Sequence, residues 1–114
     1  MKFQDFKLYR NKNYIDGEWV DSDSGDTISV NNPANLKEIG TVPKCGTSET
    51  KKAIESANNA WPEWKAKSAR QRSEILRKWF DLIIKNKEEL AQIMTTEQGK
   101  PINESRGEIV YGAS

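Results

Sequence analysis

The sequence predicts an α+β protein. An N-terminal antiparallel β hairpin or meander is expected within residues 1–46, and three to four α-helices are expected within residues 47–114. Two observations indicate this division. Before residue 46, short runs rich in β-branched and aromatic residues are separated by Asp, Asn, Gly and Pro, which favour turns. After residue 46, apolar residues recur at the spacing of one helix face.

The first part contains three candidate strands. Residues 14–20 have Asp16-Gly17 at their centre, a pair that supplies the positive φ angles of a type I′ hairpin turn. Residues 27–30 predict a second strand, and residues 37–42 predict a third. Residues 31–35 between them predict a turn, because the residue before a proline is disfavoured in a helix. A sheet of two or three such strands is barely stable alone.

The first helix is expected to follow Pro43–Gly46. Thr47 or Ser48 can cap it, and Glu49 in its first turn favours the positive end of the helix dipole. Its apolar face extends to Trp64. Pro62 is expected to kink or end this helix, since proline removes a backbone hydrogen bond.

The later helices have clearer boundaries. Ser68 and Gln71 have the spacing of a capping box, which precedes a strongly amphipathic segment. Asn86 is expected to break that segment before a further helix that extends to about Glu97. Gly99 then fits the position after a helix end, and Pro101 fits the first turn of a last helix. This last segment still has helical character at Ser114, so the chain is expected to end inside a helix.

Composition predicts a thin core and limits the partners. Only 35% of the residues are hydrophobic and 31% are charged, with a mean hydropathy of −0.85, so apolar faces are expected to pack against residues outside this sequence. The net charge of +1 argues against nucleic acid. No segment has the length of a membrane span, the N-terminal segment is no secretory signal, and a single cysteine favours a reducing compartment. We therefore expect a soluble, cytoplasmic protein.

The residues that could carry chemistry do not combine into an active site. Cys45 is the only thiol, and the chain contains no histidine that could act as its base. Glu104 and Glu108 would share a helix face, but such spacing is typical of a solvated surface. No G-x-G-x-x-G or P-loop motif is present, and metal sites built from His and Cys are excluded.

Several short motifs, taken together, carry more information than any one alone. They are Tyr14–Val20 (YIDGEWV), Asn32-Pro33 with Glu38–Pro43 (EIGTVP), Ala53–Trp64, Ala69–Arg72 with Leu76-Arg77, Glu97–Pro101 (EQGKP) and Glu104–Glu108 (ESRGE). In this order and spacing they resemble the N-terminal segment of aldehyde dehydrogenases, and most closely the succinate-semialdehyde dehydrogenase branch. Ser105 stands where that branch usually has Ala, and Thr95-Thr96 replaces a more apolar pair.

The resemblance implies that the chain is the incomplete start of an α/β, Rossmann-type NAD(P)-binding domain. The longer enzyme would be a homo-oligomer that uses NAD or NADP to oxidise an aldehyde, with succinate semialdehyde as the implied substrate. The family's nucleophilic cysteine, general-base glutamate and cofactor-binding turn have no counterpart here, so no catalytic or cofactor-binding residue is assigned. The resemblance also implies a structural monovalent cation bound by main-chain oxygens of Val30, Asn31 and Glu97.

Two functional interpretations stay open. The chain is either the N-terminal portion of such an enzyme, inactive alone and packing against the remainder of the chain or against itself, or a stand-alone interaction module derived from the family. The first predicts poor autonomous folding or self-association, because apolar faces lack partners. The second predicts a cooperatively folded species of defined stoichiometry.

Overall fold

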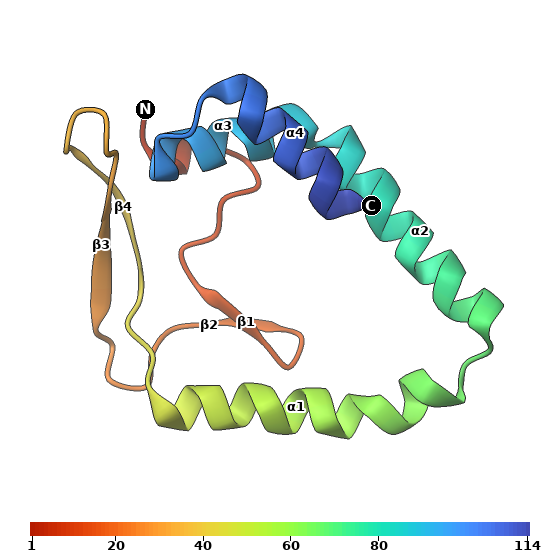
Figure 1. Ribbon diagram of the computed structural model, residues 1–114. Helices are drawn as coiled ribbons and strands as arrows, with labels where there is room; N and C mark the ends of the chain where they lie inside the picture. Colours follow the sequence, from red (N-terminus) through yellow and green to blue (C-terminus); the bar gives the residue numbers. More distant parts are fainter.

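The computed structural model describes all 114 residues and contains two antiparallel hairpins followed by four helices (Figure 1). This confirms the predicted α+β arrangement. The elements are a 3-10 turn at Phe3–Asp5, β1 Asn13–Ile15, β2 Glu18–Val20, β3 Thr27–Asn31, β4 Glu38–Pro43, α1 Thr47–Ala66, α2 Ala69–Lys85, α3 Lys87–Gln98 and α4 Ile102–Ala113.

The strands form two separate antiparallel hairpins, so of the predicted hairpin or meander the hairpin arrangement is the one present. The β1–β2 turn is confirmed: Asp16 has φ 53° and Gly17 has φ 79°, both positive as a type I′ turn requires. β3 pairs only with β4. The chain turns in the segment between β2 and β3. There Ser22 Oγ donates to the Asp26 carbonyl at 2.7 Å, and Gly25 adopts a positive φ of 77°.

The start of α1 differs from the prediction. Gly46 is the cap residue and makes no side-chain cap, so Thr47 and Ser48 already lie in the first turn. Ser48 has another partner, because its hydroxyl donates to Asp23 Oδ2 at 3.0 Å. The helix also continues past Pro62 to Ala66 instead of ending there. Only one N–H is lost at a proline, and the last turn closes where the Lys67 N–H donates to the Trp64 carbonyl at 3.2 Å.

The boundaries of the later helices follow the sequence closely. The capping box is confirmed: the Gln71 N–H donates to Ser68 Oγ at 3.2 Å, and the Ser68 N–H donates to Gln71 Oε1 at 2.9 Å. Asn86 separates α2 from α3, and Gly99 ends α3 with φ 80°. Pro101 precedes α4 instead of lying in its first turn, and its carbonyl accepts the first N–H groups of that helix.

The small core depends on the N-terminal segment. Phe3, Phe6 and Ile39 are buried together, and Val30 of β3 and Ile93 of α3 pack against them, as does Tyr9. The Phe3 ring stacks on Tyr9 with centroids 4.1 Å apart. The same ring lies so close to Gly40 that a Cβ there would be 2.7 Å from Phe3 Cδ2. The first residues therefore join the β3–β4 hairpin to α3.

The helices enclose little volume. α1 runs along one side of Figure 1 and packs against β1, while α2 leads away to the α3–α4 pair. The Cα radius of gyration is 16.6 Å, compared with roughly 13 Å for a compact domain of this length. Only 9 of 114 residues are buried, which confirms the thin core that composition predicts. None of the helices is long and apolar enough to cross a lipid bilayer.

We predict that Gly40→Ala destabilises the chain by about 1–3 kcal/mol, because the added methyl group would overlap the Phe3 ring inside the core. Thermal unfolding followed by circular dichroism measures the effect. Gly107→Ala is the matched control: no atom lies within 4 Å of its added Cβ, so replacing a glycine inside α4 should stabilise slightly. Equal melting temperatures for the two variants would contradict this description of the core.

Candidate functional site

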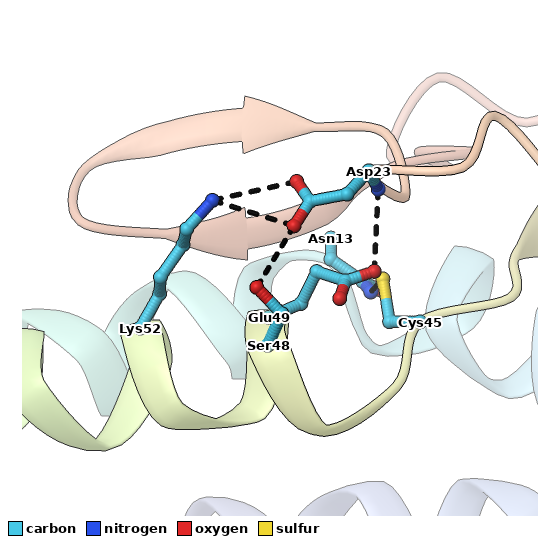
Figure 2. Close-up of polar contacts among 6 residues, drawn as sticks. All are labelled: Asn13, Asp23, Cys45, Ser48, Glu49 and Lys52. Atoms are coloured by element: carbon cyan, nitrogen blue, oxygen red, sulfur yellow. Dashed lines mark hydrogen bonds and ion pairs between the residues drawn. The ribbon is translucent and has the colours of Figure 1, made fainter.

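Cys45 lies between β4 and α1, beside the β1–β2 hairpin (Figure 2). Asn13 Nδ2 donates a hydrogen bond to its sulfur at 3.0 Å. On the other side, the Glu49 carboxylate lies close to the thiol (Figure 2). Desolvation raises the pKa of the Cys45 thiol, and the neighbouring Glu49 carboxylate raises it further. This environment stabilises the neutral thiol and disfavours the thiolate that a nucleophile requires.

Glu49 is the main polar contact between α1 and the segment after β2. Its side chain is only 7% exposed, and its Oε2 accepts the Asp23 N–H at 3.2 Å. The pKa of Glu49 is lowered because its carboxylate accepts its own N–H and that of Asp23. A carboxylate so held stays ionised at neutral pH. Glu49 therefore fixes structure, and its lowered pKa makes its carboxylate a weaker base than an ordinary glutamate.

The same end of α1 holds Asp23 through two further residues (Figure 2). Ser48 donates to Asp23 Oδ2, and Lys52 Nζ lies 3.4 Å from both carboxylate oxygens. The ion pair is more than half exposed, so it stabilises only weakly. Together with the Glu49 contact, these bonds fix the Asp21–Asp26 segment against the first two turns of α1.

An open, acidic cleft of about 370 Å³ lies between the β1–β2 hairpin and α1. Asp16, Glu18, Asp23, Glu49 and Glu55 line it, with Lys52 as its cation. No group of three or more His, Cys, Asp or Glu side chains in the structure is arranged to hold a metal ion. The cleft is therefore negatively charged, but its side chains are not arranged to coordinate a metal ion.

The residues of the expected cation site lie on two elements that meet. Val30 and Asn31 end β3, where the β3–β4 register shifts and regular strand pairing is interrupted. Glu97 lies in the last turn of α3, whose carbonyl groups have no partner within the helix. Gly99 packs directly against Pro33, which brings the end of α3 to the turn after β3. Partial burial raises the pKa of the Glu97 carboxyl, because desolvation disfavours its ionised form.

An ion pair with two hydrogen bonds joins α3 to α4. Arg106 Nε donates to Glu88 Oε2 at 2.9 Å, and its Nη2 donates to Glu88 Oε1 at 2.8 Å. This paired contact lowers the pKa of Glu88 to about 2. Glu108 pairs with Lys100. Glu104 and Glu108 therefore do not form an acid–base pair, because Glu108 has a cation of its own.

The sequence did not predict the contacts of Cys45 with Asn13 and Glu49. It indicated only that Cys45 has no histidine that could act as its base. Glu49 has the sequence signal of a first-turn acid, but its partner Asp23 lies 26 residues earlier, and no spacing rule joins them.

We predict that Cys45 reacts slowly with iodoacetamide at neutral pH and that Glu49→Gln accelerates the reaction. Removing the carboxylate charge lowers the pKa of the thiol, and one pKa unit changes the thiolate fraction about tenfold. The measurement is the alkylation rate as a function of pH. Glu55→Gln, in the same cleft but without contact to the sulfur, is the control and should react like the unmodified chain. Identical rates in all three proteins would refute the assigned contact.

Comparison with known proteins identifies relatives over the whole chain. A family model described as the aldehyde dehydrogenase family matches residues 19–114. A glutarate-semialdehyde dehydrogenase of Pseudomonas putida is 55% identical over 114 residues, and the NADP(+) succinate-semialdehyde dehydrogenase of Escherichia coli is 49% identical over 114 residues. Both alignments cover 100% of this chain and 24% of the relative, so the chain spans about a quarter of the length of these curated relatives.

Solved structures agree with this similarity. An NADP dependent enzyme of E. coli superposes with a TM-score of 0.91 at 50% identity, over 94% of this chain and 22% of that one. A succinate-semialdehyde dehydrogenase from Burkholderia pseudomallei superposes with a TM-score of 0.89 at 53% identity, over 92% of this chain and 22% of that one. The arrangement of hairpins and helices described above is therefore shared with much longer proteins.

Proposed function

Because the chain belongs to the aldehyde dehydrogenase family, we propose that it forms the N-terminal portion of an NAD(P)-dependent enzyme that oxidises a dicarboxylic semialdehyde. The observation that carries this proposal is the similarity to a glutarate-semialdehyde dehydrogenase and a succinate-semialdehyde dehydrogenase along the full 114 residues. The two names share one substrate class, an aldehyde at one end of a short chain with a carboxylate at the other. Succinate semialdehyde is the substrate implied by the sequence motifs, and glutarate semialdehyde is its longer homologue.

These residues do not fit a dinucleotide by themselves. Dinucleotides bind at the carboxyl ends of parallel strands, beside a glycine-rich turn. Here the strands pair only in antiparallel hairpins, and no G-x-G-x-x-G sequence is present. Residues outside these 114 would hold NAD or NADP in the complete enzyme. The contribution of this chain is then structural: it supplies the β3–β4 hairpin and the helices against which that site is built.

The chain alone is proposed to be inactive. Its one thiol is kept neutral by burial and by Glu49, no histidine is available as a base, and the buried carboxylate of Glu49 is already bound to backbone N–H groups. Nucleophilic attack on an aldehyde needs an activated nucleophile, which this arrangement does not provide. The complete enzyme is proposed to be a homo-oligomer of the cytoplasm, where the free Cys45 thiol would stay reduced.

The isolated chain should produce no reduced nicotinamide from succinate or glutarate semialdehyde with either NAD or NADP, measured by absorbance. A chimera tests the positive part of the proposal. In it, this chain replaces the matched N-terminal segment of the E. coli relative, which is 49% identical. We expect the chimera to oxidise both semialdehydes faster than an aldehyde without a carboxylate. A folded chimera that oxidises neither would contradict the proposed function, and turnover by the isolated chain would contradict its inactivity.

We also propose that Val30, Asn31 and Glu97 bind a structural monovalent cation through main-chain oxygens. Three features support this site: the interrupted strand pairing at Val30 and Asn31, the position of Glu97 in the last α3 turn, where carbonyl groups lack partners within the helix, and the contact of Gly99 with Pro33. Carbonyl oxygens are the ligands that hard cations prefer. A bound ion would join the β3–β4 hairpin to α3, beside the contacts of Phe3.

Potassium or sodium should therefore raise the melting temperature of the chimera by a few degrees, compared with choline at the same ionic strength, because an ion that binds only the folded state stabilises it. Glu97→Ala keeps the main-chain oxygen and should preserve most of this response. Melting temperatures that depend only on ionic strength would refute the site.

A further inference from the structure

The side of α2 that carries Ile75, Leu76, Trp79 and Leu82, hereafter the α2 face, is exposed although it is apolar. Trp79 is 63% exposed, and Leu82 is 57% exposed. Helical spacing places all four side chains within one arc of the helix. The other side of α2 is solvated, with exposed ion pairs between Arg70 and Glu74 and between Arg77 and Asp81. α2 is therefore an amphipathic helix whose apolar side is covered only in part, by α4, within these 114 residues.

A groove continues this surface. It has a volume of about 570 Å³ and lies between α2 and the end of α4. Its α2 side is lined by Leu76, Trp79, Phe80 and Ile83 together with Ser73 and Arg77, and its α4 side by Gly112, Ala113 and Ser114. A Cβ added to Gly112 would meet no atom within 4 Å, so another chain could approach α4 closely. More than half of the lining residues are hydrophobic, so most of the groove would exclude water when it is occupied.

We propose that the α2 face and its groove are a docking surface for the remainder of an aldehyde dehydrogenase chain. This inference rests on the proposed function. It goes further by assigning the contact to one helix face and by placing Trp79 at its centre. The partner's surface is expected to be mostly apolar, because apolar side chains dominate the α2 face and Arg77 is the charged residue that lines the groove.

The amount of exposed surface favours the remainder of the chain over a second copy of this one. The solvent-accessible surface is 8530 Å², compared with roughly 6,300 Å² for a compact protein of 13.0 kDa. The excess is roughly 2,200 Å², whereas each partner of a standard-size interface buries about 800 Å². Large apolar side chains are also exposed on other helices, among them Trp61 of α1 and Tyr111 of α4.

These surfaces belong to helices on different sides of the molecule (Figure 1). One symmetric contact between two copies would leave much of them exposed. A chain that fills the space beside several helices could cover them together. The relatives supply such a chain, since this sequence accounts for only 24% of their length.

The test places Trp79→Asp in the chimera with the remainder of the E. coli relative and measures its melting temperature. Burying an unpaired carboxylate is costly, so we expect the melting temperature to fall by at least ten degrees or the soluble chimera to be lost. Arg70→Asp introduces the same residue on the solvated side of α2, where Arg70 is 89% exposed, and should change the melting temperature little. Trp79→Phe should restore most of the stability.

In the isolated chain, Trp79→Asp should leave the helical circular dichroism signal unchanged, because the side chain is exposed there. The proposal is overturned if the chimera tolerates Trp79→Asp as well as Arg70→Asp, or if the unmodified chimera does not fold. It is also overturned if the isolated chain forms a dimer of defined mass that Trp79→Asp dissociates, since the face would then serve a second copy. A stable chimera without semialdehyde oxidation would refute the proposed function and leave the docking surface supported.

Discussion

The packing of Phe3 is the contact on which the rest of the structure depends. Its ring lies against Tyr9 and over Gly40, in a cluster that also includes Ile39 of β4 and Ile93 of α3. Two-stranded hairpins and single helices are marginal in water by themselves. One buried aromatic side chain joins two such pieces, the β3–β4 hairpin and α3, and the close approach is possible only because residue 40 has no side chain. The expected cation site lies beside this junction, at the ends of β3 and α3.

The other half of the molecule is joined by polar contacts instead. Glu49 and Asp23 connect α1 to the segment after β2, and Asn13 adds a contact from β1 to Cys45. These bonds explain why the thiol and the carboxylate, although close together, form no catalytic pair. Each group already has partners that hold it in its resting protonation state: the carboxylate ionised by N–H groups, and the thiol neutral by desolvation and the nearby negative charge.

The exposed apolar surface connects structure and function. A chain with 9 buried residues among 114 has helices whose apolar sides are available for further packing. Family membership supplies the reason, since the same fold occurs within proteins about four times longer. Both proposed roles of this segment, scaffold for a cofactor domain and docking surface for the remaining chain, follow from faces that a complete enzyme would cover.

Local chemistry by itself determined the hairpin turn at Asp16-Gly17, the capping box of α2 and the helix end at Gly99, because each depends on residues within four positions of one another. The ordered motifs also determined the family. Only the tertiary structure decided that the N-terminal segment supplies Phe3 and Phe6 to the core. It also decided that Asp23 contacts α1, which holds residues 21–26 there between the two hairpins. Both depend on contacts between residues 25 or more positions apart, which no local pattern records. The position of Pro62 within α1 is a local matter that the sequence left open, because a helix loses only one N–H at a proline and can continue beyond it.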